Sequence, residues 1–577
     1  MEIGEYKFSQ EGRMNVLDHP FGKDWPVVYL LHNKKKIYIG ETSNLFTRFD
    51  QHLSTREKQK LTDVKVIFDE EFNKSAILDI EQSLIRMFSA DGKYELLNAN
   101  SGQSAKHNYY QREKYLNKIE GSSQEKGIWT RLKELGLVSN DYSTIVNSDL
   151  FTYSPYTSLT MEQEAVCYKV VEDLIYGLEN YSYRGTTCIV DGAAGTGKTI
   201  IGVYLMALLV NGNKREIDAE ASPGADMSTE KFRALHKLRQ YIEKHGEIKI
   251  AYVLPMSSIR KTIKKVFTLS KNGLKASMVM GPTDIVGEMY DIIIVDEAHR
   301  LSKRQNIGWM GSFDNACRQL KIDPKKSNCL DWIVKSSKCR VLFYDPNQRI
   351  KNSDITPAEL NNSLNNSWVA RYELYTQMRC NAGSSFMEYL AKMFTCSLDR
   401  KESFDKFEFK MFLKSKEMID CIKKQNDRIG LSRVVAGYSW EWKTKGLTRL
   451  EAERKGIYDI KLDGIGYVWN NTNCEWILRK DSINEIGCVH TTQGYDLNYV
   501  GVILGREIDY DPKTNSIVIN KDYFFDKNVK QGSTDQELKS FILNAYKVMM
   551  ARGIKGCYIY AYNKNLREYL KKFVDFI

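Results

Sequence analysis

A glycine-rich segment between a predicted strand and a predicted helix constrains the fold of this chain more than any other feature. Residues 191–199 read Asp-Gly-Ala-Ala-Gly-Thr-Gly-Lys-Thr, which fits the pattern G-x-x-x-x-G-K-[ST]. A β-rich run at 186–190 precedes the segment, and an apolar run at 200–210 follows it and is typical of a buried helix. A strand, a glycine turn and a helix in this order are the context that a phosphate-binding loop needs. The alternative, a glycine-rich turn that binds no ligand, would not account for the strand and the helix on its two sides.

The chemistry of this loop follows from its residue types. Glycines allow backbone N–H groups to turn inwards around phosphate oxygens, and the helix N-terminus adds a partial positive charge at the same point. Lys198 supplies a full charge for the β- and γ-phosphates, and the Thr199 hydroxyl can bind Mg²⁺. The predicted nucleotide-binding residues of the loop are Gly192, Ala193, Ala194, Gly195, Thr196, Gly197, Lys198 and Thr199.

Length and composition limit the classes of protein to which the chain can belong. A chain of 577 residues is too long for one core and predicts three or four domains. No apolar run reaches the ~18–20 residues that span a bilayer, and the polar N-terminus argues against a secretory signal. The 11 cysteines, an odd number without a C-x-x-C pair, predict free thiols in the reducing cytoplasm.

The alternation of predicted strands and helices predicts an α/β fold with parallel sheets. A small compact unit at 1–102 is followed by a linker or small adaptor at 103–158. One series of strands then predicts a parallel-sheet unit at 159–364, and a second series predicts another at 365–577. The predicted strands of the two series lie at 187–190, 248–254, 292–295 and 340–344, and then at 372–375, 434–438, 499–504 and 556–560.

Two carboxylates follow directly after a predicted buried strand at 290–295. At the carboxyl end of a parallel strand beside a phosphate loop, Asp296 can hold Mg²⁺ through water. The neighbouring Glu297 can orient and deprotonate the attacking water. An Asp-Glu pair after an apolar strand is common by chance, but together with the loop it predicts ATP hydrolysis.

From Leu159 to the C-terminus the chain resembles a superfamily 1 helicase core, because short motifs follow one another in the expected order. The resemblance implies two RecA-like lobes that face each other across one nucleotide. It also implies that Gln163 reads adenine, that Gln348 senses the γ-phosphate, and that Arg379 and Arg552 reach the triphosphate. The matching segments are 159–163 for the glutamine motif, 254–258 for motif Ia, 344–348 for motif III, 377–379 for motif IV, 489–494 for motif V and 550–553 for motif VI.

Departures from the common motifs bring the chain closer to the Schlafen-like branch of DNA/RNA helicase domains. Motif III reads Asp-Pro-Asn-Gln, motif VI reads Met-Ala-Arg, and the block at 487–496 also resembles that branch. Because the branch lacks large inserted subdomains, translocation or a nucleic-acid-gated switch is as compatible with the sequence as strand separation. The net charge of +11 suits a nucleic-acid partner, although a basic surface that binds nothing has the same charge.

The first 102 residues carry a second set of polar residues. Two strands at 27–31 and 37–40 predict a hairpin that brings two tyrosines close together. Thr42 or Ser43 can cap the next helix, and a buried carboxylate falls within the apolar stripe of a later one, where its ionised form is costly without a cation. The six polar residues are, in chain order, Tyr29, Tyr38, Arg48, His52, Glu81 and Asn98.

This set resembles a GIY-YIG nuclease domain over about residues 25–100. The resemblance implies that Glu81 holds one Mg²⁺ or Mn²⁺ at the scissile phosphate and that Arg48 stabilises the phosphorane charge. Tyr29 or Tyr38 would activate the water with His52 nearby, and Asn98 would support the phosphate or Glu81. In the first signature triplet, residues 27–29, the usual Gly and Ile are replaced by valines. The alternatives are sheet-packing tyrosines, an exposed His52, and a core carboxylate at Glu81 that pairs with Arg48.

The sequence as a whole predicts a nuclease–helicase fusion. ATP hydrolysis between two RecA-like lobes would move or sense nucleic acid, and a metal-dependent endonuclease would cut it in the cytoplasm, in defence against foreign DNA. DNA is the favoured partner, RNA remains open, and no membrane segment is predicted. The alternatives are an ATPase switch or repair helicase whose N-terminal domain only binds nucleic acid, and a non-enzymatic scaffold, against which the intact Lys198, Thr199, Asp296 and Glu297 speak.

Overall fold

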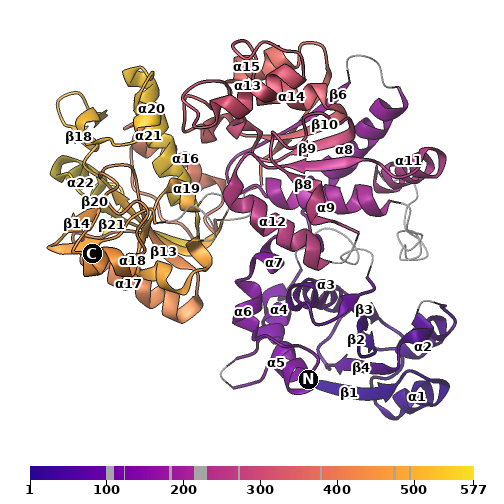
Figure 1. Ribbon diagram of the computed structural model, residues 1–577. Coiled ribbons are helices and arrows are strands. Elements are labelled where there is room, and N and C mark those ends of the chain that lie inside the picture. The colour runs from indigo at the N-terminus through magenta and orange to yellow at the C-terminus, as the bar shows by residue number, and fades with distance from the viewer. Residues whose placement is uncertain are drawn as a thin grey trace. The chain divides into compact units, whose positions relative to one another are not determined.

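The computed structural model describes residues 1–56, 58–98, 109–122, 124–180, 185–212, 230–270, 273–376, 380–471, 476–492 and 495–577. The chain forms two compact units, and Figure 1 shows its helices and strands. The predicted α/β class is confirmed, since one small mixed sheet is followed by two six-stranded parallel sheets. The first unit comprises Met1–Ile175, Ile200–Ile248 and Ile263–Ser277, and the second comprises Tyr176–Thr199, Lys249–Thr262 and Met278–Ile577.

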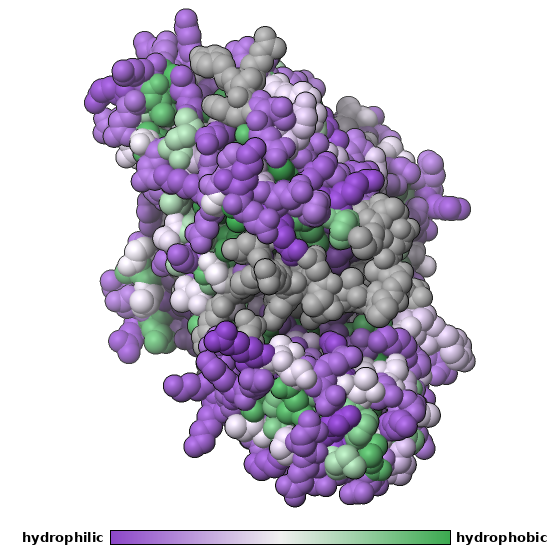
Figure 2. Space-filling view, turned by 90° about the vertical axis from the view of Figure 1, so that its right-hand side faces the viewer, coloured by the Kyte–Doolittle hydropathy of each residue, from purple (hydrophilic) through white to green (hydrophobic). Residues whose placement is uncertain are grey.

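On the face shown in Figure 2, hydrophilic side chains predominate and apolar side chains form small separate patches. Among the helices of the described segments, none combines the length and the apolar character that a bilayer crossing requires.

A five-stranded sheet with the order β1-β4-β2-β3-β5 forms the centre of the N-terminal domain. Its second and third strands pair antiparallel, which confirms the predicted hairpin. The long helix α3 buries an apolar face against this sheet, and its N-cap Asn73 and left-handed Gly92 mark its two ends. The elements are β1 Glu2–Lys7, α1 Gln10–Asn15, β2 Val27–His32, β3 Lys36–Thr42, α2 Leu45–Leu53, β4 Asp63–Phe68, α3 Lys74–Asp91 and β5 Glu95–Leu96.

Four further helices complete the core of this domain. The Trp129 ring packs edge-on against Phe88 of α3, with the ring centroids 5.4 Å apart, and the indole N–H donates to the Asn140 carbonyl at 2.9 Å. The described part of the segment predicted as a linker or adaptor is therefore folded onto α3, which favours the adaptor. These helices are α4 Arg112–Glu120, α5 Ile128–Glu134, α6 Tyr142–Val146 and α7 Asp149–Thr152.

The first parallel sheet has the order β11-β6-β10-β9-β7-β8. Parallel strands end at the same edge of a sheet, where open α/β sheets place their ligands. The segment predicted to open the second sheet at 372–375 lies instead in β11, which pairs with β6 of the first sheet, so that prediction is wrong. An alternating pattern identifies a strand but not the sheet edge that it joins. The strands are β6 Thr186–Gly192, β7 Ile250–Val253, β8 Val279–Met280, β9 Tyr290–Val295, β10 Ser337–Tyr344 and β11 Trp368–Leu374.

Helices alternate with these strands along the chain, as the crossover connections of a parallel sheet require. The predicted helix near 229–245 is present as α11, although residue 229 lies outside the described residues. The helices are α8 Met161–Glu179, α9 Lys198–Asn211, α11 Glu230–His245, α12 Ser257–Ser270, α13 Met310–Gln319, α14 Cys329–Lys335 and α15 Pro357–Ser363, and the short 3-10 helix η5 spans Pro346–Gln348.

The second parallel sheet has the order β16-β13-β17-β20-β12-β21 and contains three of the predicted strands, β13, β17 and β20. Two small hairpins stand outside it, β14–β15 and β18–β19. Its strands and the hairpins are β12 Glu408–Met411, β13 Ser432–Ala436, β14 Ile460–Leu462, β15 Ile465–Tyr467, β16 Ile486–Gly487, β17 Leu497–Leu504, β18 Ile508–Asp511, β19 Ser516–Ile519, β20 Gly553–Ala561 and β21 Asp575–Phe576. The helices are α16 Ser384–Phe394, α17 Ser415–Ile429, α18 Arg449–Arg454, α19 Val489–Thr492, α20 Lys527–Lys530, α21 Asp535–Met550 and α22 Lys564–Leu570.

The packing of α5 on α3 gives a first testable prediction. Trp129→Ala should lower the stability of the N-terminal domain by ~3–5 kcal/mol, because it empties a fully buried site. Amide hydrogen exchange in the full chain should then be faster in α3 and in α5, and Trp129→Phe should be milder. Unchanged exchange in α3 would mean that the 103–158 segment is a linker after all.

Candidate nuclease and nucleotide sites

The register of the first hairpin brings two buried tyrosines together. Tyr29 on β2 and Tyr38 on β3 have ring centroids 6.3 Å apart. Tyr29 lies opposite Gly40, where a Cβ atom would be 2.4 Å from the Tyr29 hydroxyl. Only glycine at this position leaves room for the Tyr29 side chain to lie across β3.

Helix α2 carries two basic residues to the Tyr29 hydroxyl. Arg48 Nε donates to the hydroxyl oxygen at 3.3 Å, and His52 Nε2 lies 2.6 Å from the same oxygen. The Asn44 side chain caps α2 by accepting from the Thr47 N–H at 3.0 Å. The prediction of a cap at Thr42 or Ser43 is therefore wrong, because Thr42 still belongs to β3 and its hydroxyl accepts from the Asn44 N–H.

Burial and a neighbouring lysine, Lys58, keep His52 neutral. The Lys58 ammonium lies 3.1 Å from His52 Nδ1 and 3.4 Å from the centre of the Tyr38 ring. Burial, together with the charges of Lys58 and Arg48, lowers the pKa of His52 to about 2, so the imidazole is neutral near pH 7. Because Nδ1 accepts from Lys58, the ring proton is assigned to Nε2, which faces Tyr29. His52 is 3% exposed, so the alternative of an exposed helix residue is wrong.

The hydroxyl of Tyr29 is consequently a neutral phenol that accepts two hydrogen bonds. Burial raises its pKa, Arg48 opposes this, and the nearby charge of Glu81 adds to the increase. With Arg48 and His52 donating to the oxygen, the phenolic proton remains for a third group. Lys58 could not be predicted, since no sequence spacing signals that a lysine six residues after His52 returns to its ring.

Glu81 and Asn98 both follow this cluster in the chain, Glu81 on α3 and Asn98 after β5. Glu81 is 7% exposed on α3, and in the described segments no three His, Cys, Asp or Glu side chains converge as a metal site. One carboxylate completed by waters nevertheless suits Mg²⁺. Asn98 Oδ1 accepts from the Ile39 N–H at 3.1 Å, and Asn98 Nδ2 donates to the Ile39 carbonyl at 2.7 Å. The Asn98 carboxamide is therefore engaged by the backbone of β3.

The phosphate loop joins β6 to α9, as the sequence predicts. Gly195 and Gly197 have φ values of 88° and 85°, in the left-handed region that favours glycine. Lys198 Nζ donates to the carbonyls of Gly192 and Ala193 at 2.5 and 2.9 Å and lies 4.0 Å from Asp345. The ammonium thus folds back over the loop that would hold the phosphates.

The carboxylates after β9 face the start of α9. The Thr199 hydroxyl donates to Asp296 Oδ2 at 2.7 Å, so two oxygen ligands of the type that Mg²⁺ prefers are adjacent. Burial and the neighbouring Glu297 raise the pKa of Asp296. Burial alone would raise the pKa of Glu297 as well, but His299, 2.8 Å away, and Lys198 outweigh it and lower the pKa. Glu297 is therefore ionised, as a general base must be.

Of the four other residues predicted to contact the nucleotide, the structure describes Gln348, Arg552 and Gln163. Gln348 Nε2 donates to Asp345 Oδ2 at 2.8 Å, so it lies beside the acid that Lys198 approaches. Arg552 is buried and donates to the Tyr495 carbonyl at 3.4 Å. Gln163 Oε1 accepts from the Thr160 N–H at 3.0 Å as part of a cap on α8. Arg379 lies outside the described residues.

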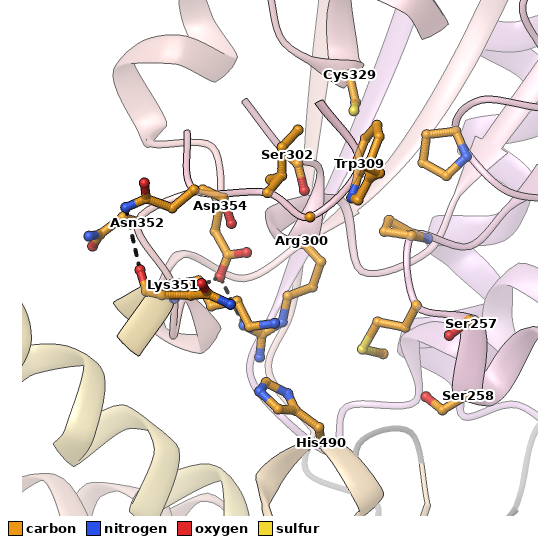
Figure 3. A pocket seen from close by; sticks show the side chains of 18 of the residues that line it. Ser257, Ser258, Arg300, Ser302, Trp309, Cys329, Lys351, Asn352, Asp354 and His490 are labelled. Carbon is orange, nitrogen blue, oxygen red and sulfur yellow. Dashed lines mark hydrogen bonds and ion pairs between the residues drawn. The ribbon is translucent and has the colours of Figure 1, made fainter. Parts of the chain in front are cut away.

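A groove of about 530 Å³ runs along the motif Ia segment. In Figure 3, Ser257 and Ser258 lie on one side of it and Lys351 and Asn352 on the other, with Arg300 in between. Arg300 Nη1 donates to Asp354 Oδ2 at 2.9 Å, and the same carboxylate oxygen accepts from the N–H groups of Ile350 and Lys351. Further lining residues are Arg260, Trp309, His490, Asp526 and Asn528.

The contact between Tyr29 and Gly40 gives a second prediction. Gly40→Ala should displace the Tyr29 hydroxyl and cost ~1–3 kcal/mol, the usual cost of overpacking. In a Tyr29→Ala background most of that cost should disappear, which a double-mutant cycle of thermal unfolding measures. Gly308→Ala is the matched control, since a Cβ there meets nothing within 4 Å. A cost of Gly40→Ala that is independent of Tyr29 would contradict the steric explanation.

Several known proteins are similar to this chain. The uncharacterized Saccharomyces cerevisiae protein YPL245W is 24% identical over 471 residues, which cover 74% of this chain and 93% of the yeast protein. The arterivirus nonstructural protein 10 helicase in complex with DNA is 12% identical, with a TM-score of 0.27 and coverage of 70% and 67% of the two chains. The Bacteroides Pif1 helicase with ADP-AlF3 and single-stranded DNA is 12% identical, with a TM-score of 0.23 and coverage of 68% and 92%.

Two family profiles match the chain directly. Residues 26–95 match the GIY-YIG catalytic domain, which contains the hairpin, α2 and α3. Residues 185–563, well over half of the chain, match the Schlafen group 3, DNA/RNA helicase domain. The chain therefore belongs to the Schlafen group 3 DNA/RNA helicase-domain family and joins that domain to an N-terminal GIY-YIG nuclease domain.

Proposed function

We propose that this chain is an ATP-dependent nucleic-acid translocase or helicase coupled to a metal-dependent endonuclease. The observation that carries the proposal is the convergence of Arg48 and His52 on the Tyr29 hydroxyl in a domain fused to a complete phosphate loop. Neutral His52 and cationic Arg48 are held by buried contacts, which is the preorganisation that catalysis requires. DNA is the favoured substrate, and defence against foreign DNA is the proposed setting.

In the nuclease site, Glu81 would hold a divalent cation beside the scissile phosphate. A bound Mg²⁺ or Mn²⁺ supplies positive charge to the phosphate and lowers the pKa of a coordinated water, at this site as at the nucleotide site. Tyr29 directs its phenolic proton away from Arg48 and His52 and so can orient the attacking water or a phosphate oxygen. Arg48 stabilises the charge that develops on the phosphate.

In the nucleotide site, Lys198 exchanges the carbonyls of Gly192 and Ala193 for phosphate oxygens when a triphosphate enters. Thr199 and Asp296 would hold the Mg²⁺ that accompanies the nucleotide. Glu297 accepts the proton of the attacking water, and His299 keeps it ionised until then. Gln348 lies where it can respond to the γ-phosphate through Asp345.

The groove of Figure 3 is the proposed path of a nucleic-acid strand. Ser257, Ser258 and Lys351 offer donors for phosphate oxygens along its two sides. Trp309 packs against Phe313 and Trp332, with ring centroids 5.8 and 6.1 Å apart, and can serve as a rigid stacking platform for a base. Arg300 follows Glu297 by three residues, so its ion pair with Asp354 connects the hydrolytic loop to the groove.

The nuclease proposal has a direct test in a Glu81→Ala variant, with Glu81→Gln as the matched control for size. Both variants should lose DNA cleavage by at least a hundredfold with Mg²⁺ or Mn²⁺, because neither side chain can bind the cation as a carboxylate does. Cleavage products, thermal unfolding and ATP hydrolysis are measured on the same preparations. If the wild type and both variants leave DNA equally intact, the N-terminal domain only binds nucleic acid.

The motor proposal predicts different behaviour for two variants. Glu297→Gln should bind ATP normally and hydrolyse it at least a hundredfold more slowly, because it lacks the base. Lys198→Ala should lose nucleotide binding itself, and also cleavage if the two activities are coupled. ATPase rates are measured with single-stranded DNA, duplex DNA and RNA in parallel. An ATPase that is indifferent to both substitutions would exclude this loop as the nucleotide site.

A further inference from the structure

Helix α21 of the second parallel-sheet domain packs beside η5 of the first, and η5 begins directly after Asp345, which lies 4.0 Å from Lys198 Nζ. The helix is capped by Thr534, whose hydroxyl accepts from the Glu537 N–H, and it leads directly to Arg552. Asn544 Nδ2 donates to the Arg349 carbonyl at 3.2 Å, and the Arg349 guanidinium lies 6.0 Å from the centre of the Phe541 ring. This side of α21 therefore packs on the segment that follows η5.

Lys547 lies three residues after Asn544 and is its neighbour on the helix surface. Its side chain is half-buried, and no hydrogen bond or ion pair holds its ammonium among the described residues. Burial lowers its pKa, and the charge of Asp345 opposes this decrease only in part. A lysine on a solvent-exposed helix face would stay hydrated, and burial would not lower its pKa.

Asp345 lies at the start of η5, next to the segment on which α21 packs. This buried acid caps η5, accepts from Gln348 Nε2 at 2.8 Å and lies 4.0 Å from Lys198 Nζ. The charge that opposes the decrease in the pKa of Lys547 is therefore that of Asp345. Lys198 and Gln348 also lie close to this carboxylate. A partly desolvated cation in this position gains free energy when an anion arrives, and a phosphate is the anion for which the loop is built.

We propose that Lys547 binds an oxygen of the terminal phosphate of the triphosphate held by the phosphate loop. The inference rests on the proposed function of that loop. Lys547 would then be the cation through which the second domain distinguishes ATP from ADP, because only the triphosphate reaches it. Arg552, one of the two arginines predicted to reach the triphosphate, is buried and donates to the Tyr495 carbonyl at 3.4 Å. In the sequence, the only indication of such a role is that Lys547 lies five residues before Arg552.

The test compares the binding of ADP and of a non-hydrolysable ATP analogue to the full chain with Mg²⁺. Lys547→Met should weaken binding of the analogue about tenfold or more, the size expected for one charge-assisted hydrogen bond, and change binding of ADP by less than about twofold. Lys547→Arg should retain most of the affinity. Lys539→Met removes a lysine from the same helix and should bind both nucleotides as the wild type does.

The outcomes separate three cases. Equal weakening of both nucleotides by Lys547→Met, together with a lower unfolding temperature, would assign Lys547 a structural role and overturn the proposal. Unchanged binding of both nucleotides by Lys547→Met would overturn it as well, provided that Lys198→Ala has lost binding. If Lys198→Ala binds both nucleotides normally, the phosphate loop is not the nucleotide site, and the proposed function fails before the role of Lys547 is reached.

Discussion

The compensation of buried charges at the carboxyl edge of the first parallel sheet is the constraint on which the nucleotide site depends. Three adjacent strands, β6, β10 and β9, end there and deliver the phosphate loop, Asp345 and Asp296. Two buried carboxylates in one place are costly unless cations and donors meet them. Lys198 and Thr199 meet these acids from the start of α9, so the loop and the acids stabilise each other even without a ligand.

In the candidate nuclease site, a buried phenol oxygen takes the place of the buried carboxylates, and basic residues again meet it. The oxygen of Tyr29 is buried, and Arg48 and His52 satisfy it from one helix. Burial and the charge of Lys58 in turn keep His52 in its neutral form. Lys58 thus orients His52, and His52 and Arg48 orient Tyr29, which is how a small domain can keep a reactive arrangement rigid.

The functional motifs were predictable because their information is local. The phosphate loop, the Asp296-Glu297 pair and the first hairpin are each encoded within a few residues, and the structure places the elements that carry them as expected. Two choices were not predictable in the same way: which sheet β11 joins, and which residue caps α2. A strand joins whichever free edge the folded chain offers, and an asparagine one residue beyond Ser43 competes equally well for the cap.

The sequence by itself determined the family, the order of the motifs and the residue types that each site requires, since these depend on short spacings along the chain. Only the tertiary structure decided which of these residues meet. It engaged Asn98 with the backbone of β3, returned Lys58 to His52, and packed the helix that carries Lys547 on the segment after η5. The physical reason is that such contacts are made by the packing of whole elements, such as α21 on the segment after η5, and no local pattern records that packing.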